Sequence, residues 1–177
     1  MRKNTLLIIV LLTVSTYSKN LKSICNLEEQ MVFTADNVIN NLYVDNTRVL
    51  KLLDVNWKKA STYKTKGLLK PGAVIKIDIA NGVDVRGKKA NANTGSYAGL
   101  LGTITYKTAD GGFKQVNTSG DWMCSGKPAR QLNTNDDKSS HWYKERKSFF
   151  SEIDSKAWWI WDETGERFIQ CTFTIPN

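Results

Sequence analysis

The side chains of this chain that could do chemistry are aromatic and planar polar residues in segments rich in turn-forming amino acids. Sugar rings present apolar C–H faces that stack on tryptophan or tyrosine, while their hydroxyls bond to planar polar groups. The aromatic candidates are Trp57, Tyr97, Trp122 and Trp142, and the polar candidates are Asp36, Asn37, Asn81, Asp84, Arg86 and Asn91. Asp36 and Asn37 also form the kind of pair that makes a tight turn, which is their simpler role.

Catalytic motifs are weak in this sequence. The single histidine, His141, follows two serines, but no G-x-S-x-G nucleophile elbow is present. Asp162, Glu163 and Glu166 could serve glycoside hydrolysis as paired carboxylates. They fall in a segment rich in threonine and glycine, which favours solvated turn residues. We therefore predict that the protein is not an enzyme.

Three cysteines, Cys25, Cys124 and Cys171, are the residues that report on redox environment. Their spacing fits no zinc pattern. In an oxidising compartment we expect Cys124 to pair with Cys171, because both lie inside the predicted domain, although spacing alone does not give the connectivity. Cys25 is then free, buried, or joined to another chain as in a homodimer.

The first eighteen residues have the plan of a secretory signal peptide. Arg2 and Lys3 precede an apolar run over residues 6–14, and small or hydroxyl side chains follow up to Ser18. The run is too short to span a bilayer comfortably, and polar residues follow it, so a membrane anchor is the weaker alternative. We expect a secreted, extracellular protein without a transmembrane segment.

Alternation of apolar and polar residues predicts β-strands in the rest of the chain. Over residues 73–81 three isoleucines alternate with Lys76 and Asp78, and residues 167–175 show the same period of two. Further strands are expected at 31–34, 40–45, 48–53, 99–107 and 113–116, separated by turns at 45–46, 71–72 and 109–112. Many short strands predict an all-β antiparallel sandwich, with at most one or two helical turns, within 139–153.

One domain is expected over residues 31–177, after a lead over residues 19–30. The segment from Gly82 to Ser96 has no apolar periodicity. Long segments of this kind in a small domain are usually functional or mobile. Five of the polar and aromatic candidates lie in this segment or directly beside it.

The order of these patterns resembles the galactose-binding-like jelly-roll domains. The segments that carry the resemblance are TADNVINNLYVDNTRV at 34–49, NW at 56–57, LLKPGAVIKIDIAN at 68–81, AGLLGTITY at 98–106, DW at 121–122 and AWWIW at 157–161. The resemblance covers about residues 30–176. It implies that AWWIW is the penultimate strand, with Trp158 or Trp159 packed into the sandwich and Trp161 on the same side as Trp159.

The resemblance implies a non-enzymatic, lectin-like protein that binds carbohydrate at a cell surface or in an extracellular coat. The ligand candidates are Trp57, Asn81, Asp84, Arg86, Asn91, Tyr97 and Trp142. Sandwiches of this kind often hold structural calcium, but no contiguous acidic loop is present, so neither a metal nor another cofactor is predicted. The main alternative is a structural protein of a matrix or secretory granule that binds other proteins.

The charge of the chain bears on the choice of partner. It carries 25 Lys and Arg against 17 Asp and Glu, a formal net charge of +8. Such a charge attracts anionic glycans, lipid head groups and nucleic acid, although scattered basic residues favour an ordinary solvated surface. We expect an extracellular glycan, which could be anionic, and no nucleic acid because the protein is predicted to leave the cell.

Asn117, Thr118 and Ser119 form an Asn-x-Ser/Thr acceptor for N-glycosylation. Such triplets also occur by chance. If this one is used, the stretch around Asn117 is expected to be a surface loop.

Overall fold

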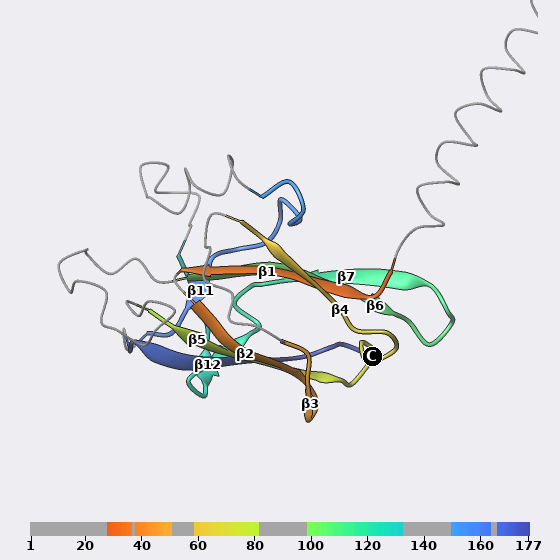
Figure 1. The fold of residues 1–177 in the computed structure, drawn as a ribbon, viewed down its shortest axis with the longest axis horizontal. Helices are drawn as coiled ribbons and strands as arrows, with labels where there is room; N and C mark the ends of the chain where they lie inside the picture. The colour runs from red at the N-terminus through yellow and green to blue at the C-terminus, as the bar shows by residue number, and fades with distance from the viewer. Residues whose placement is uncertain (1–27, 37, 51–58, 82–98, 133–149, 164–165) are drawn as a thin grey trace, which may run out of the picture.

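Two antiparallel sheets pack face to face and appear as two layers of strands in Figure 1. The computed structural model describes residues 28–36, 38–50, 59–81, 99–132, 150–163 and 166–177. The first sheet has the order β10 (Arg130–Gln131), β11 (Ile160–Trp161), β6 (Gly99–Lys107), β1 (Gln30–Asp36) and β4 (Ser61–Lys64), with β7 (Phe113–Asn117) also on β6. The second has the order β3 (Thr47–Arg48), β2 (Val38–Val44), β5 (Val74–Ala80), β12 (Phe168–Thr174), β8 (Met123–Cys124) and β9 (Lys127–Pro128).

The predicted all-β antiparallel sandwich is confirmed, and the described residues include no helix. The chain passes repeatedly between the layers: β1 and β2 lie in opposite sheets, as do β4 and β5, and β11 and β12. A helical turn was expected within residues 139–153. The described part of that segment, residues 150–153, forms a non-helical turn in which the Ile153 amide donates a hydrogen bond to the Phe150 carbonyl oxygen (3.2 Å). None of the described residues belongs to a helix with the length and apolar character needed to cross a bilayer.

The strands with clear alternation fold as their pattern predicts. In β5, Ile75, Ile77 and Ile79 are buried while Lys76 and Asp78 are half-buried on the other face. In β12 the buried residues are again every second one, and they include Cys171. β12 pairs with β5 along its whole length, so the inward faces of both strands contribute to the same core.

The core is double, because the first sheet is buried on both of its faces. Its inner face packs on the second sheet through residues such as Phe33, Leu100 and Ile104. On its outer face, Val32 and Leu101 pack under the segment 150–159 in a separate apolar cluster. This double burial explains why β6 is buried from Gly99 to Tyr106 without a wet face.

The three tryptophans near the end of the chain are packing residues, as expected, but they do not share one side. Trp159 belongs to the outer cluster with Phe150, its ring in edge contact at 5.9 Å. Trp161 belongs to the inner core, and Trp158 is partly buried against that core. The expectation that Trp159 and Trp161 lie on the same side is therefore wrong, because AWWIW bridges two apolar layers and only Ile160–Trp161 is strand.

The predicted disulfide between Cys124 and Cys171 is present. The two residues are directly opposite each other in the β8–β12 pair, and both are fully buried in the inner core. The bond closes a segment with a sequence separation of 47 residues. Loop-closure entropy for that length corresponds to roughly 4 kcal/mol of stabilisation.

Several boundaries differ from the sequence expectation. Of the strand predicted over 48–53, only Arg48 is strand among the described residues 48–50, because the Val49 and Leu50 amides both donate to the Leu42 carbonyl (2.9 and 3.3 Å). Residues 51–53 lie outside the described residues. The short strands β4, β8, β9 and β10 were not expected, since two to four residues carry too little periodicity to recognise. The turns at 45–46 and 109–112 do connect hairpins, β2–β3 and β6–β7.

Gly102 gives the sharpest test of the double core. A Cβ at this position would lie 1.9 Å from Cδ1 of Phe33 and 2.6 Å from the Val32 carbonyl oxygen. We predict that Gly102→Ala destabilises the fold by about 3 kcal/mol, the upper end of overpacking costs, in urea unfolding. Gly120→Ala is the control, because its nearest neighbour is the flexible Gln131 side chain at 3.2 Å; an equal loss in both variants would contradict the interpretation.

Candidate functional site

Most of the ligand residues predicted from the sequence lie outside the described residues. This group consists of Trp57, Asp84, Arg86, Asn91, Tyr97 and Trp142, together with Asn37, His141 and Cys25. Their roles, including the homodimer through Cys25, remain predictions.

Asn81 is the predicted ligand residue that lies within the described part of the chain. It is half-buried directly after β5, and its amide donates to the Arg167 carbonyl oxygen (2.7 Å). The register places it at the end of the sandwich where Gly99 pairs with Asp36 and Phe168 pairs with Ala80. We call this end, at which the predicted loop 82–96 would begin, the Asn81 end.

Two other residues considered as ligand contacts are structural. Trp122 is fully buried, stacked on Phe173 at 5.1 Å and edge-on to Phe33 at 5.9 Å. Its indole nitrogen donates to the Asn117 carbonyl oxygen (3.2 Å). Asp36 is 7% exposed at the end of β1, so neither residue offers a surface for ligand.

The carboxylates proposed as solvated turn residues divide into two kinds. Asp162 is 4% exposed and accepts a hydrogen bond from the Ser125 hydroxyl (3.2 Å), so the expectation that it is solvated is wrong. Glu163 and Glu166 are exposed, as expected. A hydroxyl from a distant turn holds Asp162 in place, which sequence spacing could not indicate.

The glycosylation triplet is not a surface loop, and that expectation is corrected. Asn117 ends β7, and its side-chain oxygen accepts from the Thr103 hydroxyl (2.8 Å). Thr118 is fully buried: its hydroxyl donates to the Trp158 carbonyl (2.7 Å) and accepts from the Gly102 amide (3.0 Å). Modification of Asn117 itself stays a prediction.

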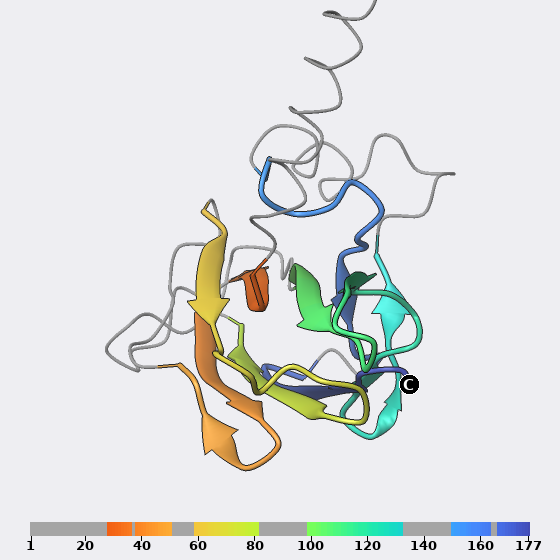
Figure 2. The same cartoon turned by 90° about the vertical axis from the view of Figure 1, so that its right-hand side faces the viewer.

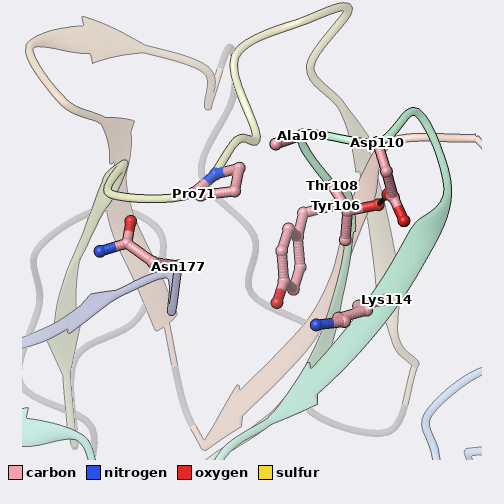
Figure 3. Close-up of a pocket in the computed structure, with 7 residues that line it drawn as sticks. All are labelled: Pro71, Tyr106, Thr108, Ala109, Asp110, Lys114 and Asn177. Carbon is pink, nitrogen blue, oxygen red and sulfur yellow. Dashed lines mark hydrogen bonds between the residues drawn. The ribbon is translucent and has the colours of Figure 1, made fainter.

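The C-terminus lies at the other end of the sandwich (Figures 1 and 2), and a pocket of about 360 Å³ is found there, beside the last residue of the chain (Figure 3). Seven residues line it: Pro71, Tyr106, Thr108, Ala109, Asp110, Lys114 and Asn177. They come from the turn before β5, the β6–β7 hairpin and the stretch after β12. We call this site the hairpin pocket, and its volume lies in the range of small-ligand sites.

Backbone hydrogen bonds fix the walls of the hairpin pocket relative to one another. The Lys107 amide donates to the Leu69 carbonyl (3.3 Å), which joins the hairpin to the segment before Pro71. The Gly72 amide donates to the Ile175 carbonyl (2.9 Å), which joins that turn to the end of the chain. The pocket is therefore held by both sheets, although its residues are far apart in sequence.

Within the hairpin, strand register decides which side chains enter the pocket. Tyr106 of β6 is directly opposite Lys114 of β7, so both side chains leave the sheet on the same face. Tyr106 is 2% exposed, so its ring is packed in the inner core beneath the pocket, while Lys114 is exposed (Figure 3). The apolar surface open to a ligand comes from Pro71 and Ala109, beside a few polar groups.

Asp110 is held rigidly at the tip of the hairpin. Its Oδ1 accepts from the Thr108 hydroxyl and from the Gly112 amide (3.2 Å), while the Thr108 amide donates to the Gly112 carbonyl (2.9 Å). These bonds, the Thr108 hydroxyl first, lower the pKa of Asp110 below its ordinary value, and the nearby charge of Lys114 acts in the same direction. Asp110 is thus an ionised acceptor whose Oδ2 can receive a ligand hydroxyl.

Comparisons with protein-family models, curated proteins and solved structures find no match to this chain. In the part of the chain that the structure describes, no three histidine, cysteine or acidic side chains gather as a metal-binding group.

The ionisation of Asp110 can be tested by replacing the hydroxyl that bonds to it. We predict that Thr108→Val raises the pKa of Asp110 toward its ordinary 3.8, measured by NMR titration of the carboxyl carbon. Because the folded-state pKa is lowered, these bonds stabilise the fold above the unfolded-state pKa and are lost as pH falls through the folded-state pKa. Thr62→Val, on exposed β4, is the control and should leave the titration of Asp110 unchanged.

Proposed function

We propose that this protein is a secreted, non-enzymatic carbohydrate-binding protein, and that the hairpin pocket is its binding site. The observation that carries the proposal is the lining of the pocket, where Pro71 and Ala109 provide an apolar surface and Asp110 provides a fixed acceptor. Sugar rings require this combination of an apolar surface for their C–H face and oriented polar groups for their hydroxyls. Pockets for fully apolar ligands would not need an ionised carboxylate at the rim.

Each described polar group of the pocket has a role in this proposal. Asp110 accepts a sugar hydroxyl at Oδ2, because its Oδ1 already receives the bonds from Thr108 and Gly112. The side-chain amide of Asn177 can both donate and accept, and the Lys114 ammonium can donate. Since bonds within the hairpin hold Asp110 before ligand arrives, less conformational entropy is lost on binding.

Binding rather than catalysis is supported by the character of Asp110. Glycoside hydrolysis normally uses two carboxyl groups, one of them protonated to serve as the acid. The pKa of Asp110 is lowered by its hydrogen bonds, which favours a permanent acceptor over a proton donor.

Secretion and the galactose-binding-like family belong to the same proposal. A disulfide between Cys124 and Cys171 supports the first, because such bonds persist in oxidising compartments. An antiparallel sandwich with repeated crossings between layers is compatible with the second. Fold alone does not assign a ligand, so the proposal depends on the pocket.

A glycan array probed with protein secreted from cells expressing the full sequence tests this function. We predict that Asp110→Asn weakens binding to the best glycan about tenfold or more, because a hydrogen bond to a charged acceptor is lost. Asp121→Asn is the matched control, since Asp121 is also an exposed loop carboxylate bonded to a hydroxyl two residues away, that of Ser119 (3.2 Å). Failure of the parent protein to bind any glycan would refute the proposal.

The alternative of a structural, protein-binding role has its own observation. Phe168 is 62% exposed and Met123 is 38% exposed. Phe168 lies on the outward face of β12, as does Thr172, and Met123 is directly opposite Thr172. In the structural role, a partner protein would cover these two exposed apolar side chains.

If that role is the correct one, the protein forms oligomers without glycan. We then expect Phe168→Ser to shift the sedimentation profile toward monomer, because the change removes most of the exposed apolar surface of this face. Phe113→Ser is the control, because Phe113 is exposed on β7 in the other sheet. A monomeric parent protein at high concentration would exclude the structural role.

A further inference from the structure

We propose that the hairpin pocket selects an acidic sugar, a hexuronic acid whose single carboxylate binds Lys114 while its hydroxyls bind Asp110. This inference rests on the proposed carbohydrate-binding function and specifies its ligand class. It follows from the placement of one positive and one negative side chain, not joined in an ion pair, in the lining of one small pocket.

The two charges of the pocket are held apart by the hairpin. Lys114 projects beside Tyr106 because these residues are opposite each other in the register. In Figure 3 the Tyr106 hydroxyl and the Lys114 ammonium lie together below the ring, whereas the Asp110 carboxylate lies above with Thr108. Bonds to Thr108 and Gly112 keep Asp110 at the hairpin tip, and no ion pair joins it to Lys114, although the structure describes both residues.

This separation selects the ligand by charge complementarity. A neutral sugar would satisfy Asp110 through its hydroxyls but would leave the Lys114 ammonium without an anionic partner. A densely anionic ligand would place negative charge against Asp110, which its lowered pKa keeps ionised. A sugar with hydroxyls at one end and one carboxylate at the other matches both groups.

The carboxylate end would receive two donors. The Lys114 ammonium supplies a charge-assisted hydrogen bond, and the Tyr106 hydroxyl beside it can supply a second. The apolar face of the sugar ring would lie against Pro71 and Ala109. No covalent step is involved, so Lys114 acts as a specificity determinant.

The test compares hexuronic acid monosaccharides, of gluco and galacto configuration, with their methyl esters, in which the single carboxyl group has lost its charge. We expect the acid to bind about tenfold more tightly than its ester in titration calorimetry, with an advantage that shrinks as salt rises. Lys114→Met should abolish the advantage and leave binding of the ester within about twofold of the parent protein. Tyr106→Phe should reduce the advantage severalfold and keep the ring surface.

Lys107→Met is the matched control. Lys107 is on the same hairpin, but it follows Tyr106 and is opposite Phe113, so it leaves the sheet on the other face. If Lys107→Met reduces the preference as much as Lys114→Met does, overall charge explains it and the inference is wrong. Thermal unfolding of both variants confirms that they fold.

The remaining outcomes separate this inference from the function on which it rests. Equal binding of acid and ester would overturn the acidic-sugar assignment and leave carbohydrate binding in place. Preference for sulfated over carboxylated sugars would also overturn it. If the protein binds neither the acid, nor the ester, nor any glycan on the array, the proposed carbohydrate-binding function is itself refuted.

Discussion

Burial of β6 on both faces is the constraint on which the rest of the structure depends. Its Leu100 belongs to the inner core and its neighbour Leu101 to the outer cluster, so the strand loses contact with water on both sides. Such a strand must also satisfy its buried polar side chains. The Thr103 hydroxyl does this by donating to Asn117 (2.8 Å) and accepting from the Asp154 amide (3.0 Å), which ties β7 and the covering segment to the same residue.

The hairpin pocket follows from where this strand leaves the core. Tyr106 is still buried, whereas Lys107 is exposed, and the chain turns back through Asp110 toward β7. Because β6 is anchored along its whole length, the hairpin tip does not need to fold against a ligand to acquire its shape. Rigid backbone positions Asp110 and Lys114, while the turn at Pro71 closes the pocket from the second sheet.

The sequence predicted the features that depend on residues close together in the chain, and it missed those that depend on contacts between distant segments. The alternation of apolar and polar residues was sufficient to predict β5 and β12, because a strand with one solvent-facing side shows that environment in its own sequence. The burial of Asp162 beside Ser125 and the division of Trp159 from Trp161 could not be predicted, since both depend on distant segments. The pocket was not predicted for the same reason: Pro71 and Asp110 were expected in turns and Tyr106 and Lys114 in strands, and only the sandwich brings them together.

The Asn81 end and the hairpin pocket are alternative sites rather than halves of one. They lie at opposite ends of β5, whose seven residues span about 20 Å at the usual rise per residue. A ligand small enough to fill the pocket therefore touches neither Asn81 nor the strand ends around it. The Asn81 end, chosen from loop composition, and the hairpin pocket, found in the folded structure, are therefore independent hypotheses about where the ligand binds. Substitutions at one end should leave binding at the other unchanged, because a packed sandwich separates them.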